Sequence, residues 1–122
     1  GLVPLYIKTA YKREPVFSHS KIVFTIGENT FKDKLGSAFT ERANIHANIK
    51  PKDLEVFKEA NNTAMFKGGA TYADAITFGA PKVEKKLSDE FAKAKGKKVL
   101  PFSGWDTDLT EYLDLYNELA AK

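Results

Sequence analysis

The sequence predicts an α/β fold in which a parallel sheet of three or more strands carries helices on both faces. Three short apolar runs are rich in β-branched and aromatic side chains and are bounded by polar or turn residues: 21–26 (KIVFTI), 75–79 (AITFG) and 98–102 (KVLPF). Their apolarity is continuous rather than alternating, which is typical of parallel strands that are covered on both faces.

The segment between the second and third runs predicts a crossover helix over residues 81–96. Pro81 suits the first helical turn and Gly96 supplies the stop. One apolar stripe follows the helical period: Val83, Leu87, Phe91 and Ala94. Strand, helix and strand therefore form a βαβ unit, whose crossover is expected to be right-handed.

Further helices are predicted before and after this unit. Residues 4–12 and 53–60 have helical patterns, and so do residues 62–73, in which adjacent Gly68 and Gly69 indicate a close packing contact. The first of these helices is expected to direct its apolar side chains toward a core: Leu5, Ile7 and Tyr11.

The chain ends in a predicted amphipathic helix over residues 108–122. Asp108 and Glu111 have the spacing of a capping box. The expected core stripe of this helix has five members: Leu109, Tyr112, Leu113, Tyr116 and Leu119. A sheet of three strands is thin for so many helices, so we expect a missing domain or a second copy of the chain to cover the sheet edge.

Composition excludes several classes of function. The chain has 122 residues, 43% of them apolar and 29% charged, which is typical of one folded domain and not of a disordered segment. The absence of cysteine excludes thiolate chemistry and disulfides and fits a cytoplasmic protein. The net charge is only +3, so no nucleic-acid partner is expected, and no apolar run is long enough to span a membrane.

The residues that could carry chemistry form no recognisable catalytic set. His19 and His46 lie in polar stretches without a third ligand at metal spacing, so they are expected at the surface and no metal site is predicted. The serines lack the G-x-S-x-G elbow of a hydrolase: Ser18, Ser20 and Ser103. The acidic residues near the last helix are explained by capping and solubility: Asp106, Asp108, Glu111 and Asp114.

The remaining two features also favour structural roles. Trp105 lies in a turn after the third run, where closing the edge of a core is a more common role than stacking on a sugar. The run Lys67-Gly68-Gly69 lacks the spacing of a P-loop, and no GxGxxG follows a strand. No cofactor is therefore predicted.

Two stretches of the chain resemble bacterial and plant glycogen and starch synthases. PLYIKTAYKREPVFSHSKIVFTIGENTF is similar to a segment in which a PLYLK helix leads to a strand ending in Thr-Ile-His-Asn. FKGGATYADAITFGAP is similar to a stretch of the form LKGGI-YAD-ITTVSP, in which a helix leads to the next strand. The order and spacing of the two motifs agree with the family.

The resemblance implies that residues 1–122 form a single partial Rossmann-like domain, the C-terminal part of the N-terminal lobe of a two-lobed glycosyltransferase. Members of the family transfer glucose from ADP-glucose to an α-1,4-glucan in glycogen biosynthesis. Their Lys-x-Gly-Gly donor loop is expected before residue 1, and their nucleotide-binding domain after residue 122. The implied partners are therefore ADP-glucose and α-1,4-glucan.

Scaffold residues match the family better than polar site residues do. The matching positions are Lys67, Gly68, Gly69, Tyr72, Ala73, Asp74, Thr77 and Pro81. In contrast, Gly27 and Glu28 stand where the family has His and Asn, Lys32 and Asp33 stand for its Gln-Gly, and Ala80 replaces a serine. We therefore expect a retained fold without turnover by this chain alone.

Ligands of open α/β sheets gather at the carboxyl ends of the strands. The residues at these positions are the predicted substrate-binding set: Gly27, Glu28, Asn29, Ala80 and Pro81. No catalytic residue is assigned. Two alternatives remain open, a non-catalytic glucan-binding or regulatory module on the same scaffold and a protein-interaction domain without a sugar ligand.

Overall fold

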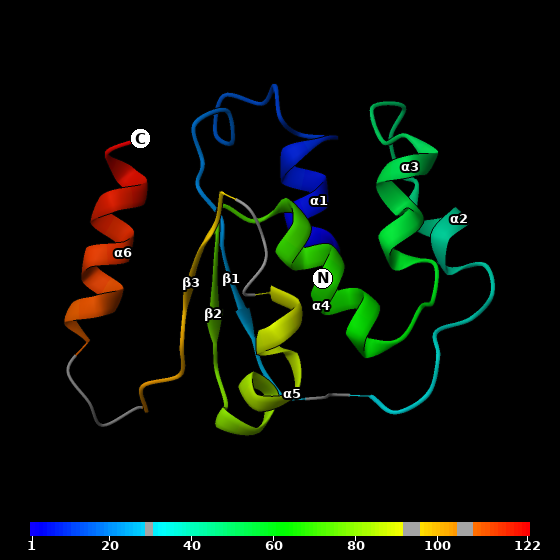
Figure 1. Cartoon of the computed structure of the whole chain (residues 1–122). Coiled ribbons are helices and arrows are strands. Elements are labelled where there is room, and N and C mark those ends of the chain that lie inside the picture. The colour runs from blue at the N-terminus through cyan, green and yellow to red at the C-terminus, as the bar shows by residue number, and fades with distance from the viewer. Residues whose placement is uncertain (29–30, 92–95, 105–108) are drawn as a thin grey trace. The chain divides into compact units, whose positions relative to one another are not determined.

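The computed structural model confirms the α/β fold class (Figure 1). The strands β1 (Val23–Ile26), β2 (Ala75–Phe78) and β3 (Lys98–Leu100) form one parallel sheet in the order β1-β2-β3. The structure describes the following residues: 1–28, 31–91, 96–104 and 109–122.

The chain folds into two compact units, which are described separately. Unit 1 comprises Gly1–Ser20 and Asn29–Tyr72, and unit 2 comprises Lys21–Glu28 and Ala73–Lys122. All three strands belong to unit 2. The expectation of a single partial domain over residues 1–122 stays a prediction.

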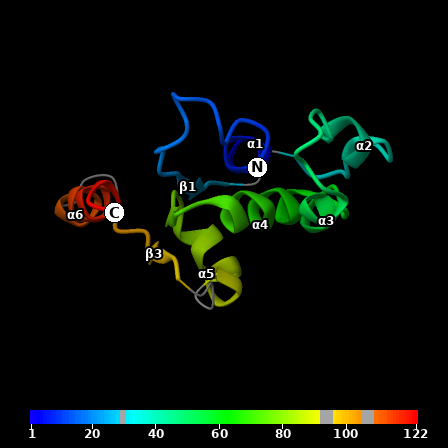
Figure 2. The same cartoon turned by 90° about the horizontal axis from the view of Figure 1, so that it is seen from above.

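In unit 2, helices cover both faces of the sheet. Helix α5 (Pro81–Phe91) connects β2 to β3 and α6 (Thr110–Ala120) follows β3, and Figure 2 shows the two helices on opposite sides of the sheet. The central strand β2 is consequently buried along its whole length. The predicted stripe of α5 is confirmed at three positions: Val83, Leu87 and Phe91. Its fourth member, Ala94, lies outside the described residues.

Helix α6 uses a different face from the predicted one. Its core residues Leu115 and Leu119 are 0% and 7% exposed and pack with Ala75, Leu100 and the partly buried Tyr112. Three members of the predicted stripe are instead 52%, 60% and 50% exposed: Leu109, Leu113 and Tyr116. Both stripes fit the helical period and share two residues, so the pattern alone does not choose between them.

The strands are shorter than predicted because local hydrogen bonding limits them. The amide of Ile22 donates to a carboxylate oxygen of Asp74 over 2.7 Å, and β1 begins one residue later. β3 ends at Leu100, immediately before Pro101, which has no N–H to donate to a sheet ladder.

Unit 1 is helical in its described part. Its elements are α1 (Leu2–Lys8), α2 (Phe39–Ala43), α3 (Pro51–Leu54), the 3-10 helix η1 (Glu55–Phe57) and α4 (Asn62–Tyr72). α1 and α4 contact each other, and the core of the unit includes Leu5, Leu54 and Phe57. α2 was not predicted because so short a helix carries no readable period. No helix in the described part of the chain has the length and apolarity to cross a membrane.

The first helix is shorter at its C-terminal end than predicted. The hydroxyl and the amide of Thr9 both donate to the carbonyl of Leu5, and α1 ends at Lys8. Leu5 is fully buried, as expected, and Ile7 is partly buried. The expectation for Tyr11 is wrong, because this residue lies beyond the helix and is 40% exposed.

Candidate functional site

The carboxyl ends of β1 and β2 lie side by side in unit 2. Ile26 pairs with Phe78 in the parallel register, and the amide of Gly79 donates to the carbonyl of Ile26 over 2.9 Å. A Cβ atom added to Gly79 would lie 3.7 Å from the Cα of Gly27. The structure therefore brings the two predicted binding segments to one edge of the sheet.

Four of the five predicted binding residues are described at this edge. Gly27 is partly exposed, and Glu28 and Pro81 are exposed. Ala80 is only 8% exposed, so it can offer a ligand little more than its backbone. Asn29 lies outside the described residues. A binding role for all five stays a prediction.

The other residues weighed for chemistry occupy surface or structural positions. His19 and His46 are exposed, and the acidic Glu111 and Asp114 are exposed on α6. The hydroxyls of Ser18 and Ser20 donate to the carbonyls of Pro15 and Val16, whereas Ser103 is partly buried. Three further candidates lie outside the described residues: Trp105, Asp106 and Asp108. Among the described residues, no group of three or more His, Asp or Glu side chains is arranged to hold a metal ion.

A pocket of about 320 Å³ lies in unit 2 beneath the exposed side of α6, and we call it the α6 pocket. Its lining residues are Thr25, Thr77, Phe78, Gly104, Leu109, Tyr112, Leu113 and Tyr116. The hydroxyls of Thr25 and Thr77 are hydrogen-bonded over 2.8 Å, because the two residues are partners in the β1-β2 register. The α6 pocket thus combines apolar and aromatic walls with a pair of hydroxyls.

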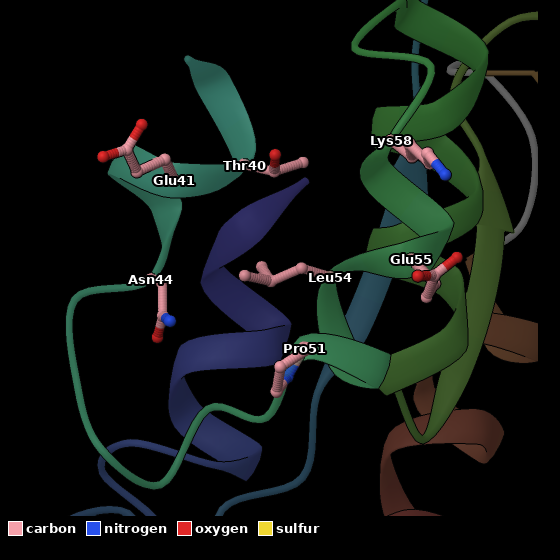
Figure 3. A pocket seen from close by; sticks show the side chains of 7 residues that line it. All are labelled: Thr40, Glu41, Asn44, Pro51, Leu54, Glu55 and Lys58. Carbon is pink, nitrogen blue, oxygen red and sulfur yellow. The ribbon is translucent and has the colours of Figure 1, made fainter. Parts of the chain in front are cut away.

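A second pocket, of about 550 Å³, lies in unit 1 between α2 and α3. It is lined by Thr40, Glu41, Asn44, Pro51, Leu54, Glu55 and Lys58 (Figure 3). Figure 3 shows Glu55 and Lys58 on one side of the pocket, whereas Glu41 lies on the other side and points away from both. Because Glu41 is separated from Glu55 and Lys58, the three charged side chains do not converge on one point.

Gly68, the first glycine of the pair in α4, makes the close packing contact that was expected of this pair. A Cβ atom on Gly68 would lie 2.0 Å from Cε1 of Phe57, whose side chain is fully buried. Only glycine lets the helix backbone approach the aromatic ring this closely. The run Lys67-Gly68-Gly69 therefore includes a contact point between α4 and η1.

The Tyr-Ala-Asp part of the motif fixes backbone segments in the same way. The hydroxyl of Tyr72 lies 3.1 Å from Oδ1 of Asp53 and 3.2 Å from its carbonyl oxygen, and it donates to Asp53. Asp74 accepts the amide of Ile22 at the start of β1. These contacts give the motif a structural explanation without any role in chemistry.

The environment of Tyr72 predicts a loss of stability at alkaline pH. Burial, followed by the hydrogen bond to Asp53 and the charge of Asp53, raises the pKa of Tyr72 to about 12 from 10.0. A raised pKa in the folded state stabilises the fold fully below about pH 10, and this contribution is lost as the pH rises through about 12. Tyr72→Phe should therefore lower the free energy of unfolding by about 1 kcal/mol at neutral pH.

The difference between the parent and Tyr72→Phe should shrink as the pH rises toward the pKa of Tyr72. Urea denaturation over a pH series measures it, and phenolate absorbance identifies the late-titrating tyrosine that the variant lacks. A difference that stays constant across this range would show that the hydroxyl is not held as described.

Comparison with known proteins places the chain in a family. The starch synthase catalytic domain family matches residues 1–101. The chain belongs to this family. It is 30% identical over 91 residues to the glycogen synthase of Pseudothermotoga lettingae, which covers 74% of this chain and 18% of that protein. The identity to the glycogen synthase of Thermotoga petrophila is 27% over 101 residues, 82% of this chain and 20% of that protein.

The match to the starch synthase catalytic domain family ends at residue 101, and this chain is much shorter than its relatives. The chain spans about a fifth of the length of the two relatives named above. The matched residues include all three strands, whereas α6 lies beyond them. No solved structure matches the chain.

Sequence reasoning missed the α6 pocket. The two hydroxyls of this pocket belong to Thr25 on β1 and Thr77 on β2. These residues are neighbours only because of the register in which the two strands pair. Tyr116 and Leu113 were assigned to the core, so their exposure was not anticipated. The one available signal was that α6 carries more apolar residues than a single buried stripe needs.

Proposed function

We propose that this chain is the acceptor-side part of a glucosyltransferase that transfers glucose from ADP-glucose to an α-1,4-glucan. Membership of the starch synthase catalytic domain family, with a match over residues 1–101, is the observation that carries the proposal. The parallel sheet supports it, because its carboxyl edge is where open α/β sheets bind ligands. Gly27, Glu28, Asn29, Ala80 and Pro81 are the proposed glucan contacts.

The chain by itself is proposed to bind glucan without turning over ADP-glucose. Gly27 has no side chain to act as an acid, a base or a hydrogen-bond donor, and the exposed Glu28 adds a negative charge at the sheet edge. A negative charge at this edge disfavours an anionic sugar nucleotide. A non-catalytic glucan-binding module on the same scaffold is the second candidate, favoured by the same two residues.

Two measurements on the 122-residue chain test the proposal. Calorimetric titration with maltohexaose should show binding, and titration with ADP-glucose should show none. Incorporation of labelled glucose from ADP-glucose into glycogen should stay at the background level. Robust incorporation would overturn the proposed inactivity, and the absence of maltohexaose binding would overturn the proposed function itself.

Gly27 offers a direct test of the sheet edge. A Cβ atom added there meets no described atom within 4 Å, so the side chain of Gly27→Trp starts in open space and is expected to block the edge. A circular dichroism spectrum like that of the parent is the check that this variant folds. The expected result is a loss of maltohexaose affinity of about tenfold or more, which corresponds to about 1.4 kcal/mol. Gly36→Trp is the matched control, because Gly36 in unit 1 also has open space around it. Equal affinities of the two variants would contradict a role for the edge.

A further inference from the structure

The α6 pocket is not explained by family membership. One of its walls is built from α6, which lies beyond the matched residues 1–101. Its volume of about 320 Å³ falls at the lower end of the range of about 300–1,000 Å³ in which proteins hold small ligands. The pocket therefore has room for a compact group such as a single ring.

The lining residues select an uncharged ligand. Among the residues that the structure describes, the eight that line the α6 pocket are all uncharged at neutral pH. The apolar wall of the pocket is accessible to a ligand and is not packed into the core. Its three members are half or more exposed: Leu109, Leu113 and Tyr116. A phosphate or carboxylate would find no cation among these residues, whereas an apolar or mixed surface would be favoured.

The hydroxyls of Thr25 and Thr77 form a polar spot in the otherwise largely apolar lining of the α6 pocket. Each threonine hydroxyl has one donor and two acceptor lone pairs, and the mutual hydrogen bond of Thr25 and Thr77 uses one donor and one acceptor. One hydroxyl hydrogen of the pair therefore has no role in the mutual bond. Thr25 is exposed, so this pair can hydrogen-bond to a hydroxyl of a ligand.

We propose that the α6 pocket binds one glucosyl ring of an α-glucan, with Tyr112 or Tyr116 against the apolar face of the ring and Thr25 hydrogen-bonded to a ring hydroxyl. A pyranose is uncharged, has apolar C–H faces and carries hydroxyls at its rim, which is the combination that the lining offers. Thr25 lies on β1 and precedes Gly27 by two residues in the chain, so the ring would lie next to the proposed edge. The inference rests on the proposed function for the identity of the glucan.

A second copy of the chain fits the same surface less well. The exposed side of α6 also carries Glu111, Asp114 and Glu118. In the described part of the chain, Glu118 is paired with Lys98 and Lys122. Two such helices laid against each other would bring carboxylates together, which disfavours a helix pair. An uncharged ligand escapes this repulsion.

Titration of single variants with maltohexaose tests the inference. Tyr116→Ala and Thr25→Val should each weaken binding, the first by about tenfold. Thr25→Ser keeps the hydroxyl and should bind like the parent, which separates hydrogen bonding from packing. Tyr11→Ala removes an exposed tyrosine that does not line the pocket, and it should also bind like the parent.

The outcomes separate this inference from the proposed function. If Gly27→Trp weakens binding while Tyr116→Ala and Thr25→Val do not, the sheet edge binds glucan and the α6 pocket does not. Loss of binding in the pocket variants alone would support the pocket and refute the edge. If the parent chain binds no maltohexaose, both proposals fail. A dimer in sedimentation that Tyr116→Ala dissociates would show that a second copy occupies the surface, and would overturn the inference.

Discussion

Replacing Gly68 with alanine is expected to lower the free energy of unfolding by about 3 kcal/mol, through steric overlap in a packed core. The added Cβ would lie 2.0 Å from Cε1 and 2.1 Å from Cζ of Phe57, far inside van der Waals contact. Phe57 is fully buried, so its ring cannot swing into solvent to make room. Urea denaturation followed by circular dichroism measures the loss.

The sign of this effect is informative because helix propensity acts in the opposite direction. Gly68 lies inside α4, where alanine would ordinarily stabilise a helix by about 1 kcal/mol over glycine. Gly36→Ala, at a position with nothing within 4 Å of the added atom, is the control and should stay within about 0.5 kcal/mol of the parent. In the Phe57→Leu background the cost of Gly68→Ala should fall. A stabilising Gly68→Ala would mean that α4 and η1 do not pack as described.

The fold class and the sheet were predictable because they depend on local pattern. Continuous apolar runs, Pro81 at a helix start and Gly96 at the expected stop are each read from neighbouring residues. The structure confirms all three runs as parallel strands. Gly96 has a positive φ of 79°, which favours glycine, whereas a helix end at this residue stays a prediction because residues 92–95 lie outside the described part of the chain. Where local hydrogen bonds decided a boundary, as at Thr9 and Ile22, the prediction was a few residues off.

Of the candidate site, the sequence predicts only which backbone segments lie close together, and not how the side chains are arranged. Parallel strands place their carboxyl ends at one edge, so the proximity of Gly27 and Gly79 follows from topology. The pairing of Thr25 with Thr77 needs the register, which no pattern in either strand specifies. The exposed wall of the α6 pocket needs the rotation of α6 about its axis, and two apolar stripes on that helix left the rotation open.

The rotation of α6 gives the second large prediction, a contrast between two leucines that are two residues apart. Leu115 is 0% exposed and packs with Leu100 and Ala75. Leu115→Ala should therefore lower the free energy of unfolding of unit 2 by about 3 kcal/mol. Leu113 is 60% exposed, and Leu113→Ala should change the free energy of unfolding of unit 2 by no more than about 0.5 kcal/mol. The same side-chain truncation on one helix thus isolates burial as the cause.

Hydrogen exchange of the amides in β2, α5 and α6 reports the stability of unit 2 directly, because local and global openings are resolved for each residue. Leu115→Ala should speed exchange throughout α6, whereas Leu113→Ala should leave it unchanged. If the two variants exchanged their effects, Leu113 would face the core as the sequence pattern suggested, and the α6 pocket would lose its apolar wall. The pair therefore tests both the packing of α6 and the surface on which the proposed glucosyl site depends.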